Sequence, residues 1–294
     1  GGAGGGAEAA SSAGGSTTSD EMGDAPLIST AEDAEGIGRG PDVDGDHCYS
    51  DLNANVFPVR GSTYMEDSVK QPSAASIFTL AHVALFKSEG KVDHLAAMSS
   101  MYLTKARARG DRRFYLIIVY QSPGSPDRVH LALYFAATKE QLRSNRRVYG
   151  LWQRFLAGDD EYRNSRWKVI PAIAEGNWIV KKSVGTKPAL LGTKLDHEWI
   201  QGPNYLECDV DVASSSMASV LVGMLQTYAR YLVIDLGFTL QGEEDGELPE
   251  QCLATVRLSR PDLERAISVR PVKTLISQGG VGHSSEVDEA MSES

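Results

Sequence analysis

Three acidic side chains at alternating positions are the first candidates for chemistry in this sequence. In the stretch NYLECDVDVASSS, residues 204–216, Glu207, Asp209 and Asp211 stand at every second position. A β-strand points alternate side chains to opposite faces, so the three carboxylates would share one face and the apolar residues between them the other. Like charges this close repel one another. A metal ion, a ligand, basic partners or water must therefore offset them.

Acid–base or metal chemistry on this face is the less favoured interpretation. Residues i and i+2 of one strand lie about 6.5–7 Å apart and point the same way, whereas a general acid and base must converge on one substrate. The histidines and cysteines are scattered, without metal-ligand spacing. In the acidic stretch 42–53, an EF-hand would need Gly and Glu where His47 and Asn53 stand. We therefore expect no catalytic residue, no metal and no cofactor, with a carboxylate-based hydrolase or metal enzyme as the alternative.

A basic stretch offers a counter-charge for these acids. EYRNSRWKVIP, residues 161–171, contains Arg163, Arg166 and Lys168, and the last two would share one face of a strand that begins there. Opposite charges on neighbouring strands stabilise a sheet by about 0.2–1 kcal/mol a pair. We predict an internal ion network that joins RNSRWK to the acidic strand, with a ligand site as the alternative.

The surrounding pattern indicates strands with several helices. RRFYLIIVYQ is rich in β-branched and aromatic residues, and VHLALYFAAT follows it after the turn SPGSPD, which predicts antiparallel neighbours. Apolar residues at helical spacing predict helices elsewhere. The predicted strands are 55–67, 112–121, 129–138, 165–174, 177–185, 205–211 and 252–259. The predicted helices are 73–90, 91–110, 139–155 and 217–240.

The fold class that fits this order is α+β. We expect a mostly antiparallel, curved sheet packed against a long C-terminal helix from Met217 to Leu240, an arrangement similar to a helix-grip fold, with an apolar cavity between them. Such a helix would be long enough to cross a bilayer, at roughly 36 Å. Arg230 and Asp235 in its middle would be costly in lipid, so we expect it to be buried against the sheet.

Composition divides the chain into a domain and two tails. Residues 1–46 contain ten acids, one base and no aromatic residue, and residues 277–294 contain four acids and no base. Both tails are predicted to be disordered, and residues 47–276 to form a single domain. That domain is electrically polarised, because residues 105–187 hold 17 bases and 7 acids, whereas residues 188–276 hold 7 bases and 13 acids.

The basic middle limits the choice of partner. No aromatic-interleaved recognition motif accompanies its Lys and Arg residues, so we expect no nucleic acid. Anionic lipid headgroups attract such residues by about 1 kcal/mol each. The unpaired spacing of Cys48, Cys208 and Cys252 is typical of a reduced compartment. The expected location is intracellular, either cytoplasmic or peripheral to a membrane.

Several stretches, in this order, resemble one known family. They are VFPVRGSTYMEDSVKQPS, EYRNSRWKVIPAIAEGNWIVKKSVGTKPALLGTKL, GPNYLECDVDVASSSMASVLVGM, YLVIDLGFTLQG and ELPEQCLATVRLS. Together they resemble the C-terminal domain of the plant Enhanced Disease Resistance 2 proteins, a domain of unknown function also seen in algae and protists, over residues 48–270. Asn164 and Trp178 stand inside these motifs and join the candidates for a ligand or ion network.

The resemblance implies a lipid-related role without catalytic residues. In the plant proteins this domain follows a pleckstrin-homology module and a lipid-transfer module, and the family is associated with lipid binding at membranes and with negative regulation of defence-linked cell death. We therefore expect a non-enzymatic lipid-binding or membrane-associating regulatory module. A protein-interaction domain without a ligand is the alternative, with protein partners that the sequence does not identify.

Overall fold

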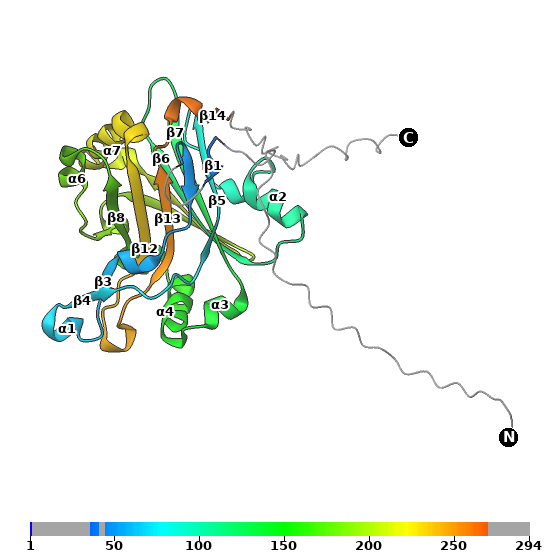
Figure 1. The fold of residues 1–294 in the computed structure, drawn as a ribbon, viewed down its shortest axis with the longest axis vertical. Coiled ribbons are helices and arrows are strands. Elements are labelled where there is room, and N and C mark those ends of the chain that lie inside the picture. Colours follow the sequence, from blue (N-terminus) through cyan, green and yellow to red (C-terminus); the bar gives the residue numbers. More distant parts are fainter. Residues whose placement is uncertain (2–35, 41–44, 270–294) are drawn as a thin grey trace, which may run out of the picture.

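The protein is an α+β domain built on two mixed β-sheets (Figure 1). The structure is a computed structural model that describes residues 1, 36–40 and 45–269. In spatial order, the first sheet contains β1 (Gly38–Arg39), β2 (Cys48–Ser50), β13 (Cys252–Ser259), β12 (Val233–Leu240), β8 (Trp167–Glu175) and β9 (Ala189–Leu190). The second sheet contains β10 (Asp196–Gly202), β11 (Tyr205–Asp211), β6 (Phe114–Ser122), β7 (Arg128–Ala137), β5 (Thr79–Ser88) and β14 (Ile267–Ser268).

Helices cover the faces and ends of these sheets. The α-helices are α1 (Tyr64–Asp67), α2 (Tyr102–Ala108), α3 (Lys139–Arg143), α4 (Arg146–Ala157), α5 (Asp160–Arg166), α6 (Trp178–Val184) and α7 (Ser216–Tyr228). The 3-10 helices include η3 (Leu95–Ala97), η5 (Val212–Ser214), η6 (Ala229–Tyr231) and η7 (Asp245–Glu247). A small antiparallel pair, β3 (Pro58–Arg60) and β4 (Lys70–Pro72), lies apart from both sheets in the pairing.

The two large sheets share one apolar core. Phe135 of β7 and Phe238 of β12 lie with their ring centroids 5.8 Å apart, so the second and first sheets touch directly. Trp167 of β8 and Trp199 of β10 meet in the same way at 5.7 Å. Phe155 of α4 packs edge-on against Trp199. Because these rings and the aliphatic residues around them fill the space between the sheets, the core is a sandwich of two sheets rather than a sheet that grips a helix.

Smaller clusters attach the helices to the outer faces. Apolar residues of η3 and α2 pack on the outer face of the second sheet, around residues such as Tyr115 and Tyr134. At one end of the first sheet, α6 and α7 pack beside each other (Figure 1). They rest on a small cluster formed by Ile173, Val180 and Leu232.

Several predicted strands are confirmed. β6 and β7 are antiparallel neighbours, with Phe114 opposite Ala137. β8, β11 and β13 lie close to their predicted positions. On β11, the apolar side chains of the alternating pattern, Leu206 and Cys208, point into the core between the sheets, while the acidic face points away from it.

The predicted long C-terminal helix is wrong. α7 ends at Tyr228, and the residues Val233–Leu240 form β12, a central strand of the first sheet. This strand is covered on both faces, by the main core on one side, where Phe238 and Leu240 lie, and by Phe57 on the other, where Asp235, Gly237 and Thr239 lie. A Cβ atom at Gly237 would lie 2.8 Å from the Phe57 ring, so the close approach requires glycine. Because this long helix does not form, the expected cavity between it and the sheet loses its basis.

Further elements differ from the prediction, and residues 64–67, expected in a strand, form α1. Residues 79–88 form β5 rather than a helix, because β5 is buried on both faces and reads as a continuous apolar run without strand alternation. Residues 178–184 form α6 rather than a strand. Asn177 caps this helix by accepting a hydrogen bond from the Ile179 N–H, and Gly185 ends it at φ 65°.

The N-terminal domain boundary also moves. Gly38 and Arg39 pair with β2, and Ile37 is buried in the main core, so part of the predicted arm belongs to the packed domain. The rest of the predicted N-terminal arm, residues 2–35 and 41–44, lies outside the described residues. The predicted C-terminal tail, residues 277–294, lies outside them as well.

Candidate functional site

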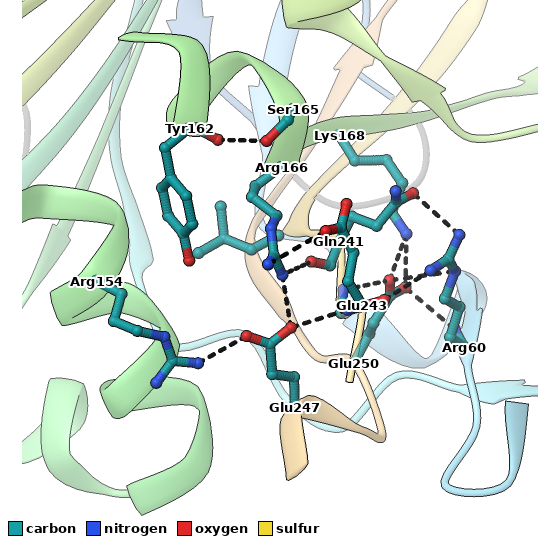
Figure 2. A network of polar contacts seen from close by, with 12 residues as sticks. Arg60, Arg154, Tyr162, Ser165, Arg166, Lys168, Gln241, Glu243, Glu247 and Glu250 are labelled. Atoms are coloured by element: carbon teal, nitrogen blue, oxygen red, sulfur yellow. Dashed lines mark hydrogen bonds and ion pairs between the residues drawn. The ribbon is translucent and has the colours of Figure 1, made fainter. Parts of the chain in front are cut away.

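The basic stretch at the start of β8 forms an ion network with the loop before β13. Arg166 donates hydrogen bonds to the Glu247 carboxylate at 2.5 Å and to the Gln241 carbonyl at 3.0 Å. Lys168 donates to both oxygens of Glu250, at 2.6 and 2.7 Å. Burial lowers the pKa of Lys168, and the Glu250 carboxylate opposes this shift. Figure 2 shows the two pairs side by side next to the loop that carries the glutamates.

Two more arginines complete this network. Arg154 of α4 donates to the second oxygen of Glu247 at 2.7 Å, and the Arg60 backbone N–H donates to Glu250 at 3.1 Å. Burial alone would raise the pKa of Glu247, but hydrogen bonds from the Glu243 N–H, Arg166 and Arg154 outweigh it and lower the pKa. An open recess of about 460 Å³ lies here, lined by Arg154, Tyr162, Arg166, Glu244, Gly246 and Glu247. Because the acids and bases of the network neutralise one another, we interpret it as a structural contact that fixes the loop before β13 to the start of β8.

Arg163 and Asn164 join α5 to the second sheet instead. The Arg163 guanidinium donates to the carbonyls of Phe155 and Leu156 at the end of α4 and to the side chain of Gln201 on β10. The Asn164 side-chain carbonyl accepts a hydrogen bond from the Trp199 indole at 2.8 Å. These contacts hold α5 between the two sheets.

Glu207 lies on the outer face of the second sheet, beneath η3. Its two oxygens accept hydrogen bonds from the backbone N–H groups of Leu95 and Ala96, at 2.6 and 2.9 Å. The side chain is fully buried, and burial raises its pKa. Glu207 therefore holds the first turn of η3, whose N–H groups have no partner inside the helix.

Asp209 is the neighbouring acid and is also buried. One of its oxygens accepts a hydrogen bond from the His94 N–H at 3.0 Å, whereas the other accepts none from the described residues. Burial, and then the charge of Glu207, raise the pKa of Asp209 to about 9. A proton therefore stays on this pair of carboxyls at neutral pH.

Asp211 differs, because it forms ion pairs near the surface with Lys91 at 2.6 Å and with Arg128 at 3.7 Å. Burial would raise the pKa of Asp211, but the hydrogen bond from Lys91 and further favourable contacts lower it.

The predicted pairing of the two strands is wrong. β8 belongs to the first sheet and β11 to the second, so RNSRWK and the acids of β11 have separate partners. The sequence prediction included the basic residues of RNSRWK and the acids of β11, but not the glutamates that pair with Arg166 and Lys168. Those glutamates lie in the acid-rich run EEDGELPE, residues 243–250, which could have indicated them. In the described residues, no group of three or more His, Cys, Asp and Glu side chains is arranged to hold a metal ion.

A third feature lies on the surface formed by α6 and α7. On α6, Trp178 is 69% exposed and Ile179 is 50% exposed. On α7, Met217 is 83% exposed and Val220 is 76% exposed. Tyr231, in the 3-10 helix η6 that follows, is 66% exposed. We call these exposed side chains and the two helices that carry them the α6–α7 surface.

The charges around this surface are uneven. Residues 176–195 contain four lysines and no acid, and residues 212–229 contain no charged side chain at all. Lys181, Lys182 and Lys187 are exposed. Of the sequence-based candidates, Trp178 alone lies on this surface. The sequence predicted the start of α7 correctly but missed its exposure, because it assigned the whole apolar run to one buried helix.

Comparison with known proteins places the chain in a family. The family model described as "Protein ENHANCED DISEASE RESISTANCE 2, C-terminal" matches residues 49–262. A "Protein ENHANCED DISEASE RESISTANCE 2-like" from Arabidopsis thaliana is 36% identical to the chain over 221 residues. The chain belongs to the Enhanced Disease Resistance 2 C-terminal family. The resemblance seen in the sequence motifs is thereby confirmed.

The chain corresponds to only part of its Enhanced Disease Resistance 2 relative, so the properties of the whole relative do not transfer to it directly. The alignment with the Arabidopsis relative covers 75% of this chain but 30% of the relative. No solved structure matches the chain. The matched region contains the ion network at the start of β8, the acids of β11 and the α6–α7 surface, so all three features belong to the family domain itself.

Proposed function

We propose that this domain is a non-enzymatic module that associates with the surface of anionic membranes. The observation that carries the proposal is the α6–α7 surface, where large apolar side chains stand in solvent beside lysines that no acid of the same segment neutralises. Exposed contiguous apolar side chains mark interaction sites. Trp and Tyr favour the boundary between headgroups and acyl chains, and lysines favour anionic headgroups.

The proposal concerns peripheral binding. Within the part of the chain that the structure describes, no helix is long and apolar enough to cross a membrane. The buried Cys48, Cys208 and Cys252 are unpaired, which supports an intracellular location. The basic middle of the sequence is spread over different sides of the fold, since α2, α3–α4 and α6 lie apart (Figure 1). The lysines of α6 are therefore the relevant part of it.

The buried carboxyls support a non-enzymatic role. Backbone N–H groups of η3 occupy both oxygens of Glu207 and one oxygen of Asp209. Neither side chain is exposed to a substrate in solution. Their contacts are those of residues that hold a surface segment on a sheet.

Vesicle co-sedimentation tests the proposal. We expect the chain to sediment with phosphatidylcholine vesicles that contain phosphatidylserine, more strongly at low than at high salt. Lys181→Glu combined with Lys182→Glu should weaken binding about thirtyfold or more, because each lysine contributes about 1 kcal/mol near an anionic surface. Absence of binding at low salt would reject the proposal.

A matched double variant controls for net charge. Lys139→Glu combined with Arg143→Glu makes the same change in charge on α3, where both side chains are exposed and far from α6 in Figure 1. This variant should bind nearly as well as the parent. Equal losses in the two variants would indicate unspecific attraction and contradict a docking surface on α6 and α7.

A further inference from the structure

We infer that α7 lies in the plane of the membrane, with its exposed side inserted at the boundary between lipid headgroups and acyl chains. This inference rests on the proposed membrane association and adds which element enters the lipid. It assigns to α7 a hydrophobic contact, and to α6 an electrostatic one.

The exposure of α7 is unusual for its composition. None of its 13 residues is buried, although residues 216–228 carry no charge and include Met217, Val220, Leu221 and Met224. A helix of this composition normally lies in a protein core or in lipid. Here the protein supplies partial cover from one side alone, where Met224 and Leu225 contact the cluster of Ile173, Val180 and Leu232.

The exposed apolar side chains of α7 lie mainly at its start. At 100° per residue, Met217 and Val220 fall within about 60° of each other, whereas Met224, at an angle between them and one turn further along, packs on the domain. Tyr228 is the exposed apolar side chain at the other end of the helix. A cap from Ser215, whose side chain accepts a hydrogen bond from the Ala218 N–H, satisfies the start of the helix. A helix of 13 residues is about 20 Å long, too short to span a bilayer, so it suits the interface plane.

The flanking residues favour lipid over a protein partner. Trp178 and Tyr231, both exposed, are residue types enriched where headgroups meet acyl chains. The exposed Lys181 and Lys182 follow Trp178 on α6, at positions suited to lipid phosphates. Arg230, two residues after the end of α7, is paired with Glu264 at 3.1 Å, so the lysines of α6 supply the cationic border. The uncharged α7 therefore lies beside exposed lysines and aromatic residues, as an interfacial helix does.

A label on α7 tests insertion directly. Val220→Cys places a thiol at a position that is 76% exposed, and the three native cysteines are buried, so an environment-sensitive fluorophore such as NBD reacts selectively with the new site. We expect a blue shift and faster quenching by acyl-chain spin labels when phosphatidylserine-containing vesicles are added.

A second label provides the control. The control substitution is Val69→Cys. Val69 is 54% exposed and follows α1, which lies at the other end of the first sheet from α7 in Figure 1. This label should not change on binding. Both measurements use the full chain, with binding checked in parallel by sedimentation.

The outcomes separate the inference from the proposed function. If the chain sediments but the label at residue 220 keeps its aqueous spectrum, insertion of α7 is wrong and electrostatic association remains. If the chain does not sediment at all, both fail. A blue shift without vesicles, together with a doubled mass in solution, would show that a second copy covers α7 and would also overturn the inference.

A pair of charge insertions tests the contribution to binding. Met217→Asp with Val220→Asp should reduce vesicle binding at least tenfold and leave the folded state intact, since both side chains stand in solvent. Met65→Asp with Val69→Asp, also exposed, should bind like the parent. Residual binding of the parent at high salt should disappear in the α7 variant, because lysine attraction is screened and the apolar contact is not. Equal binding of the two double variants at high salt would contradict insertion.

Discussion

The three acids of β11 differ because each meets different neighbours. Glu207 accepts two backbone N–H groups, and Asp211 pairs with Lys91. Asp209 lies between them with one unsatisfied oxygen, and burial raises its pKa to about 9. The alternation of the sequence shows that these acids share a face, but not that η3 covers two of them.

The protonation of Asp209 has a consequence for stability. The unfolded chain loses this proton near the ordinary pKa of 3.8, whereas the folded chain keeps it until about pH 9. The folded state is therefore destabilised progressively as pH rises between these values. Asp209→Asn cannot ionise and keeps an oxygen for the His94 N–H. We expect it to raise the free energy of unfolding by about 1–3 kcal/mol at pH 8 and to have little effect near pH 4. Urea unfolding across this pH range measures the difference.

Asp211→Asn is the matched control on the same strand. Because the pKa of Asp211 is lowered by its contacts with Lys91 and neighbours, this carboxylate stabilises the fold above its unfolded pKa and loses that effect as pH falls. The control should lose stability at neutral pH and approach the parent in acid. If Asp209→Asn behaved in the same way, the protonated state of Asp209 would be excluded.

The basic residues show what sequence can and cannot predict at this scale. Arg166 and Lys168 were expected to neutralise acids, and they do, but their partners are Glu247 and Glu250. The choice of partner depends on the order of strands in two sheets. Strand order depends on contacts between residues far apart in the sequence, so it cannot be predicted from the pattern of charges alone.

At the scale of elements, the sequence was informative where a strand has unlike faces or clear turn signals. β6 and β7 are separated by a Pro- and Gly-containing turn and were predicted well. β5 was predicted as helix because burial on both faces removes the alternation that marks a strand. β12 does alternate from Ile234 to Leu240, but this alternation was overlooked because the segment continues the apolar run of α7. α6 was predicted as a strand because Trp178, Ile179 and Val180 favour strands, whereas the Asn177 cap determines the local structure.

The stability of α7 is expected to be local. None of its residues is buried, so its opening should be independent of the core. Ser215→Ala removes the N-cap, at a cost of about 1 kcal/mol, and should speed amide exchange in α7 about fivefold. Native-state hydrogen exchange should show no change in β12.

Ser216→Ala provides the comparison for this variant. Ser216 is the first residue of α7 and does not cap it, so its removal should leave exchange in α7 nearly unchanged. Equal effects of the two substitutions would contradict the capping role. A loss of exchange protection in β12 as well would show that α7 unfolds together with the core.

At the scale of the whole molecule, function depends on where charge and apolar surface coincide. The basic residues 105–187 are a block in the sequence, yet the fold distributes them over α2, α3, α4 and α6 (Figure 1). The α6–α7 surface combines lysines with exposed apolar residues on neighbouring helices. Only the structure shows that lysines and exposed apolar residues lie together here, because α7 is a short surface helix and not the long buried helix that the sequence predicted.

The most direct test of the account is hydrogen exchange of the chain with and without phosphatidylserine-containing vesicles. Membrane docking through the α6–α7 surface predicts slower exchange in residues 178–184 and 212–231, with little change in α2, α3 and α4. Protection confined to α2 or to α3 and α4, or no protection anywhere under conditions in which the chain sediments with the vesicles, would contradict it.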